Sequence, residues 1–203
     1  LFRWSHVLFG ITWIGMLYYF NFIQGGYFKQ ASAEGLADAK AKLAPSALWW
    51  FRWGAMGTFI TGLALLGKLA IGLNNYIIVG AIFGTIMFLN VWLIIWPNQK
   101  IALGMAEGDA PAAGAKALLA SRHNVLYSAP MAFCMLASGH PDPSLGWNLY
   151  SSMSNSLIVM LVIIAALQAN AMFGKQGPLT TVKGVIHASL GLTAVMVLVF
   201  NYV

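Results

Sequence analysis

Six stretches of about 20 mostly apolar residues run along the chain, which is the length that a helix needs to cross the hydrocarbon core of a bilayer. They cover residues 2–23, 48–67, 75–97, 122–140, 155–174 and 182–203. We therefore predict an all-α, polytopic membrane protein in which residues 1–203 form a single transmembrane domain, a six-helix bundle. The stretch 122–140 is the weakest of the six, because Ser128, Pro130 and Ser138 suit a helix buried among other helices.

The small number of charged residues excludes several classes of protein. Charged residues make up 8% of the 203, and hydrophobic residues 60%, whereas a soluble domain uses about a quarter of its residues for charge. This excludes an ordinary soluble enzyme and a disordered tail. The 11 basic residues are scattered, so the net charge of +6 does not indicate nucleic-acid binding. The single cysteine, Cys134, excludes an intrachain disulfide and a covalent c-type haem.

The distribution of basic residues between the loops predicts the orientation in the membrane. If the connections between spans are numbered one to five, the odd ones and the adjoining span ends hold nine basic residues, and the even ones hold only Lys68. Cytoplasmic loops are enriched in Lys and Arg, so we expect the odd loops in the cytoplasm of a bacterium, both termini in the periplasm, and the opening stretch retained as a span. The nine are Lys29, Lys40, Lys42, Arg52, Lys100, Lys116, Arg122, Lys175 and Lys183.

Four histidines lie within the spans or at their edges, where an imidazole costs free energy unless a partner or a metal satisfies it. His123 and His140 are 17 residues apart, about 26 Å along a helix, so they belong to opposite leaflets. The predicted directions of the spans place His187 level with His123, and His6 towards His140. Two histidine pairs, one in each leaflet, are the pattern expected of a bundle that binds one or two haem b groups.

Glycines next to two of these histidines suit the same interpretation. Gly10 follows His6 by four residues and Gly191 follows His187 by four, so each lies one turn away on the same helix face and leaves room for a macrocycle. The alternative is that the histidines only hydrogen-bond helices to one another. Zinc or copper is less favoured than haem, because no carboxylate lies in a span. The same absence lowers the case for a proton-coupled or cation-coupled transporter.

A second polar group falls in the same half of the membrane as His123 and His187. Arg52 could pair with a haem propionate or an anionic substrate, or extend to the lipid head groups. The amides could join helices or line a small polar pocket; they are Asn21, Asn90, Asn124, Gln168 and Asn170. Gly80 and Gly84, four residues apart, form a close-packing motif that suits either the bundle or a dimer face.

Several segments resemble the membrane domain of the bacterial urate hydroxylase (urate oxidase N-terminal) family. They are Trp13 to Asn21, Leu48 to Gly54, Asn90 to Lys100 with its Trp-Pro-Asn-Gln-Lys run, Ser121 to Asn124, and His140-Pro141. A fainter likeness, through His6 and Trp13 to Gly15, is to haem-associated proteins of the protoporphyrinogen oxidase type.

The resemblance implies a membrane oxidoreductase that passes electrons to a cytochrome, with His6, His123, His140 and His187 as its redox centre. The family joins its membrane region to a C-terminal cytochrome c, and no haem c motif occurs in this sequence. The electron acceptor is then expected to be a separate cytochrome c or a quinone. The alternative from another class is a cofactor-free structural or accessory subunit of a larger membrane complex or homo-oligomer.

Overall fold

The computed structural model describes residues 1–68, 73–139 and 155–203, and within these ranges the regular structure is helical. Its first half consists of α1 (Phe2–Tyr18), η1 (Tyr19–Gln24), α2 (Gly25–Gln30), α3 (Ala33–Asp38), η2 (Ala39–Leu43) and α4 (Ala44–Lys68). Its second half consists of α5 (Asn75–Leu89), η3 (Asn90–Ile95), α6 (Trp96–Ala102), α7 (Ala110–Ala137), α8 (Asn155–Phe173), η5 (Gly177–Thr180) and α9 (Val182–Tyr202). The all-α prediction is confirmed.

Four helical segments of the described chain are long and apolar enough to cross a membrane. They are Phe2–Gln30, Asn75–Ala102, Asn155–Phe173 and Val182–Tyr202. The other two predicted spans also lie in long helices, α4 and α7, but these are not among the four candidates. The reason in α7 is its run of polar side chains from Ser121 to Asn124 together with Ser128. The structure thus supports a membrane protein with at least four candidate spans, and a total of six remains a prediction.

At two of the predicted span ends the helical segment continues further along the chain. The first segment runs to Gln30 rather than to residue 23, and the third runs to Ala102, through Pro97. In both places a wider π-helical turn, η1 or η3, is inserted in the helix. Such a turn shifts the hydrogen-bond register, so Pro97 becomes an early residue of α6, where its missing N–H is tolerated.

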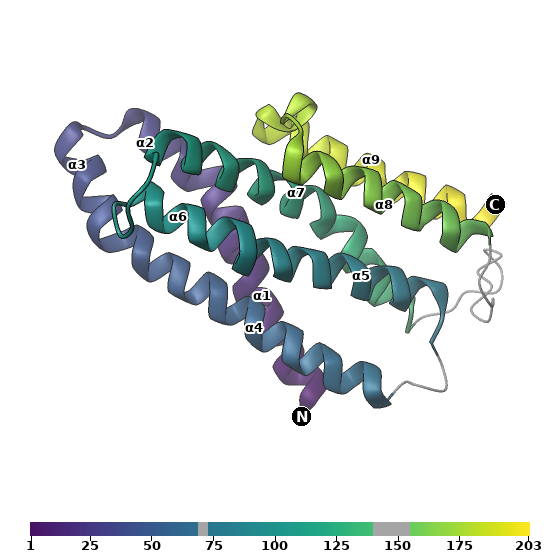
Figure 1. Cartoon of the computed structure of the whole chain (residues 1–203). Coiled ribbons are helices and arrows are strands. Elements are labelled where there is room, and N and C mark those ends of the chain that lie inside the picture. The colour runs from purple at the N-terminus through teal and green to yellow at the C-terminus, as the bar shows by residue number, and fades with distance from the viewer. Residues whose placement is uncertain (69–72, 140–154) are drawn as a thin grey trace.

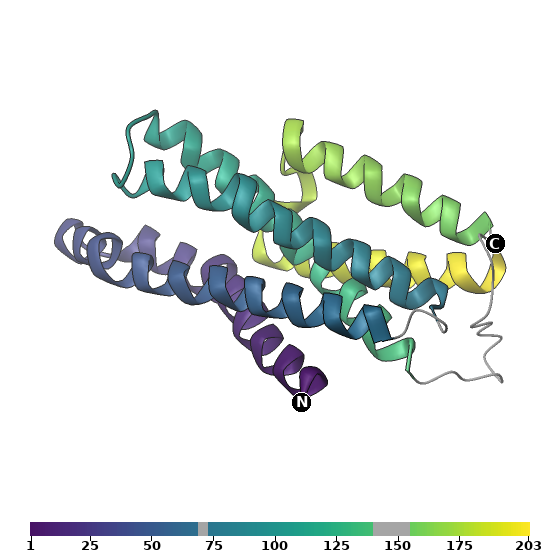
Figure 2. The ribbon, with the colours of Figure 1, turned by 60° about the horizontal axis from the view of Figure 1, so that its bottom comes forward.

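The long helices lie side by side, and α7 occupies the middle of the arrangement (Figure 1). It contacts α1, α5, α6, α8 and α9, while α4 and the α8–α9 pair lie at opposite edges in Figure 1. Figure 2 shows the same helices after rotation, with α2 and α3 gathered at one end. We call this the basic end, because Lys29, Lys40, Lys42 and Lys100 lie in or beside its short helices.

Glycines allow α1 and α4 to approach closely. A Cβ atom added to Gly54 would lie 3.0 Å from the backbone nitrogen of Trp13, and one added to Gly57 would lie 2.5 Å from the ring of Phe9. Gly80 has the same role between α5 and α7, where an added Cβ would lie 2.9 Å from the Cβ of Cys134. Four residues later, Gly84 has open space around it, so only the first glycine of the predicted motif makes a close contact.

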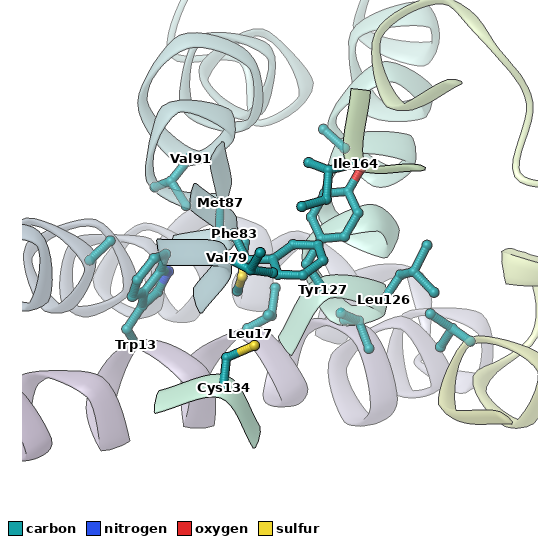
Figure 3. Packing of buried hydrophobic residues seen from close by; sticks show 14 of the residues in the cluster. Trp13, Leu17, Val79, Phe83, Met87, Val91, Leu126, Tyr127, Cys134 and Ile164 are labelled. Carbon is teal, nitrogen blue, oxygen red and sulfur yellow. The ribbon is translucent and has the colours of Figure 1, made fainter. Parts of the chain in front are cut away.

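The buried core centres on α7 and the helices around it. Figure 3 shows Phe83 and Met87 of α5, Tyr127 and Cys134 of α7, and Ile164 of α8 within one hydrophobic cluster. The Phe83 and Tyr127 ring centroids are 5.4 Å apart. This packing holds α7 rigidly, and α7 carries most of the polar side chains described next.

Candidate functional site

Four consecutive residues of α7 project polar side chains in four directions. Successive helical residues are about 100° apart around the axis, so Ser121, Arg122, His123 and Asn124 together encircle α7. Ser121 meets η1, His123 meets α8, and Asn124 meets α5 and η3. Their burial is nearly complete: His123 and Asn124 are 0% exposed, and Arg122 is 8% exposed.

The hydrogen bonds of His123 fix its orientation and its tautomer. Its Nδ1 lies 2.9 Å from the Leu119 carbonyl oxygen, and its Nε2 lies 2.9 Å from Asn170 Nδ2. Since a carbonyl only accepts, Nδ1–H is the donor, and Nε2 accepts from the amide. Asn170 also donates to the Lys175 carbonyl oxygen, so its NH2 group is directed by two acceptors. His123 is thereby held as a neutral imidazole with its Nε2 lone pair facing α8.

A network of amides joins α7, η3 and α8 beside this histidine. Asn90 Nδ2 donates to Asn124 Oδ1 over 2.9 Å, and Gln168 Nε2 donates to Asn90 Oδ1 over 2.8 Å. Asn124 in turn donates to the Met87 carbonyl oxygen, and the Tyr127 hydroxyl donates to Gln168 Oε1 over 3.4 Å. Asn90, at the start of the π-turn η3, is the centre of this network because it bonds to both of the other amides.

A second set of polar contacts joins α7 to the first helical segment. Asn21 Nδ2 donates to Ser121 Oγ over 2.7 Å, and the hydroxyls of Tyr18 and Ser128 lie 2.8 Å apart. Asn21 belongs to the π-turn η1. The π-turns η1 and η3 therefore each carry an asparagine that binds α7, as expected where such turns position functional side chains.

His123 and His187, the one predicted pair that lies within the described residues, are not directed towards each other. Ser189 donates to the Val125 and Leu126 carbonyl oxygens, so this face of α9 meets α7. His187 lies two residues earlier, about 200° around the helix, and is exposed while His123 is buried. His6 bonds to α4, through the Thr58 carbonyl oxygen and Thr61 Oγ1. His140 lies outside the described residues, so its predicted pairing with His6 is not described.

The orientation of each described histidine nevertheless suits a metal ligand. Nδ1–H donates to a backbone carbonyl in His6, in His123 and in His187, where the acceptor is Lys183. Metal-binding histidines are commonly oriented in this way. The glycine next to His187 leaves an open surface, since a Cβ added to Gly191 would meet nothing within 4 Å, whereas Gly10 faces Thr58 of α4. Each described histidine thus has the backbone hydrogen bond that is common in metal ligands, while His123 and His187 are not directed towards each other.

Arg52 is held against an aromatic ring near the basic end. Its guanidinium carbon lies 3.4 Å from the centroid of Trp96, and Lys100 Nζ lies 5.6 Å from the same ring. Stacking on an aromatic face leaves the guanidinium edge free for other groups. Within the described ranges its buried Nε and Nη1 atoms have no hydrogen-bond partner, so Arg52 packs against α6 and does not bond to the amide network.

Sequence reasoning missed three polar side chains of this region. From the sequence, Arg122 is used only as one of the basic residues that predict the orientation, and no function is assigned to the side chains of Ser121 and Tyr127. The available signal was the density of polar residues between Ser121 and Ser128 within a predicted span. A span this polar is costly in lipid, which favours a central helix surrounded by others.

The comparison with protein families agrees with this architecture. The family model described as urate oxidase N-terminal matches residues 68–201, about two thirds of the chain. The chain belongs to the urate oxidase N-terminal family. The matched part holds His123, the amide network and α9, whereas His6 and Arg52 precede it. The comparisons with curated proteins and with solved structures give no match.

Proposed function

We propose that this chain is the membrane-embedded part of a urate-oxidising oxidoreductase that passes electrons to a cytochrome or a quinone. The observation that carries the proposal is membership of the urate oxidase N-terminal family over residues 68–201. The site around α7 supports it, because a neutral, buried imidazole with an oriented Nε2 is the kind of group that binds a metal or accepts a proton.

The chemistry of His123 follows from its two hydrogen bonds. The Leu119 carbonyl holds the Nδ1 proton in place, and the Nε2 lone pair can accept a proton or a ligand when Asn170 moves aside. Asn170 is an exposed residue near the end of α8, so it can move without opening the core. The amide network beside His123 joins α7 to η3 and α8 through hydrogen bonds that do not involve Asn170.

Haem b is the proposed cofactor, in one or two copies. The ligands proposed for it are His6, His123, His140 and His187, and it would carry single electrons. The Nδ1–H bonds of His6, His123 and His187 to carbonyls support them as ligands, while His123 and His187 point in different directions. The ligand pairs therefore remain a prediction, and no step of the reaction is assigned to them.

We propose the bacterial inner membrane as the location, with the basic end in the cytoplasm and both termini in the periplasm. This rests on the excess of Lys and Arg in the odd loops. Single-cysteine variants in a Cys134→Ala background test it with a membrane-impermeant maleimide on intact cells. Lys68→Cys should react and Lys175→Cys should not; the reverse pattern would invert the proposed orientation.

The redox function is tested by one set of spectra on purified protein. Urate should reduce the protein, with a Soret band and sharp α bands appearing in the reduced spectrum, and added cytochrome c or quinone should reoxidise it. In His123→Leu the activity should fall at least tenfold, because the Nε2 lone pair is gone. Lys116→Gln, on the exposed face of α7, should have the activity of wild type. His187→Ala should lower haem content only if His187 is a ligand.

The outcomes separate the parts of the proposal. If the purified protein is colourless but still transfers electrons from urate, the proposal of haem b is refuted and the proposed redox function stands. A colourless protein without activity towards urate would refute the redox proposal.

The second candidate is a cofactor-free accessory subunit in a larger membrane complex. The specific observation in its favour is that His123, Asn170 and the three amides satisfy one another across three helices. Such bonds stabilise helix association in membranes without any cofactor. Colourless protein that co-purifies at fixed stoichiometry with other subunits would support this candidate over the first.

A further inference from the structure

We propose that Arg122 and the N-terminus of α9 form an anion-binding site between α7 and α9. The site lies one residue from His123 along α7. A role of this site in urate oxidation rests on the proposed function above, whereas the binding of an anion to the site does not.

The first observation is an unpaired buried charge. Arg122 is 8% exposed, and among the residues that the structure describes its buried Nε and Nη1 atoms have no hydrogen-bond partner. In the described part of the chain, the ion pair that the structure shows is Lys42 with Asp38, at the exposed basic end. Burying a guanidinium without a partner is costly. A chain that keeps such a group is expected to supply its counter-charge from a ligand.

The second observation is the direction in which Arg122 leaves α7. Ser121 on one side points to η1, and His123 on the other side points to α8. The sector between them is occupied by α9, whose Ser189 bonds to the Val125 and Leu126 carbonyls one turn further along α7. The side chain of Arg122 therefore leaves α7 towards α9.

The third observation is the part of α9 that this guanidinium reaches. Figures 1 and 2 show α7 and α9 running in the same direction, and helical side chains lean towards the N-terminus of their own helix. Ser189 lies beside Val125 and Leu126, and Arg122 is about one turn earlier on α7. Because its side chain leans towards the start of α7, and α9 runs in the same direction, we infer that it extends towards the first turn of α9. The short helix η5 contacts both α7 and α9 and so closes this region from the side.

The start of α9 adds positive potential at the same place. Thr181 caps the helix, since its Oγ1 accepts from the Gly184 amide over 2.9 Å and its carbonyl from the Val185 amide. Within the described residues, no hydrogen bond is shown for the amides of Val182 and Lys183. Free amides and the helix dipole make such a terminus attractive to anions, and the charge of Lys183 adds to this.

These groups define the chemistry of the ligand. The edge of a guanidinium presents two parallel N–H groups, which bind an anion whose charge is shared by adjacent acceptor atoms. The urate monoanion and the phosphate of a phospholipid head group both have this character. The experiment therefore includes one arm for each source.

The binding arm uses full-length protein in a phosphate-free, uncharged detergent, titrated with urate and separately with inorganic phosphate. Wild-type protein should bind urate and gain several degrees in melting temperature, since a ligand that binds only the folded state stabilises it. Arg122→Gln should bind at least tenfold more weakly, while Lys116→Gln, which removes an exposed charge from the same helix, should bind like wild type. Without ligand, Arg122→Gln should melt no lower than wild type.

A second variant tests the helix terminus. Val182→Pro removes one free amide at the first position of α9, where proline fits a helix and where the extended backbone of Thr181 suits a following proline. It should weaken anion binding several-fold and leave the fold intact. If Arg122→Gln fails to fold, the binding measurements are made on Arg122→Lys and Val182→Pro instead. Both variants keep a positive charge at position 122.

The lipid arm reconstitutes the protein in nanodiscs of phosphatidylcholine with or without phosphatidylglycerol. Retention of phosphatidylglycerol by wild type and its loss in Arg122→Gln, without urate binding, would assign the site to a head group. The proposal would be overturned if wild type and Arg122→Gln bound urate, phosphate and lipid equally well. Anion binding that depends on Arg122 in a protein without urate oxidation would refute only the proposed function.

Discussion

Replacing Asn90 with leucine is expected to lower the free energy of unfolding by about 1–3 kcal/mol, the cost of leaving buried polar groups without partners. Leucine branches at the same carbon as asparagine but cannot hydrogen-bond, and the volume that it adds is matched in the control variant described below. The change removes the partner of Asn124 Oδ1 and that of Gln168 Nε2 at once. Thermal unfolding of the detergent-solubilised protein measures the effect.

Asn98→Leu is the matched control for this experiment. Asn98 bonds to the Ile94 carbonyl oxygen in its own helical turn and joins no second helix in the described contacts. Its replacement should shift the melting temperature much less than Asn90→Leu. Equal shifts for the two variants would show that the amide network contributes nothing beyond local helix stability.

Gly80→Ala is expected to destabilise the contact between α5 and α7 by about 1–3 kcal/mol, the usual cost of an extra methyl group in a packed interior. The added Cβ would lie 2.9 Å from the Cβ of Cys134 and 3.5 Å from the backbone nitrogen of Met135. Since Cys134 Cβ is fixed to the backbone, α5 and α7 must separate to accommodate it. The same thermal unfolding measurement tests this prediction.

Gly84→Ala provides the control on the same helix. A Cβ at Gly84 meets no atom within 4 Å, and alanine favours a helix over glycine by roughly 0.5–1 kcal/mol. Its melting temperature should equal or exceed that of wild type. If Gly80→Ala were as stable as Gly84→Ala, the close approach of α5 and α7 would not hold in the membrane.

Parts of the candidate site could be predicted from the sequence, because hydropathy fixes which polar residues lie at membrane depth. His123, Asn124, Asn90 and Gln168 were placed in one half of the bilayer, and the structure brings the three amides together. The predicted pairing of His123 with His187 relied on depth alone. Depth does not fix rotation about the helix axis, and Ser189 rather than His187 faces α7.

From the sequence, the stretch 122–140 is expected to be buried among other helices, but the sequence alone does not identify this helix, α7, as the central one. Its polar run looked like a weak span, because hydropathy measures suitability for lipid and takes no account of neighbouring helices. Once α1, α5, α8 and α9 surround α7, Ser121, His123 and Asn124 each bond to another part of the chain. Arg122 is the exception within this run, because no described residue hydrogen-bonds to its buried Nε and Nη1 atoms, and this appears only when the neighbouring helices are in place.

The sequence by itself determined that the chain is helical and apolar enough for a membrane, and its motifs resemble the family to which it belongs. Both properties depend on the identity and order of residues, which do not change on folding. Only the tertiary structure decided which imidazole is buried, which glycine makes a close contact, and which polar side chain of the Ser121–Asn124 run has no partner among the described residues. Each of these depends on how a helix is rotated against its neighbours, and that rotation is set by the packing of all the helices together.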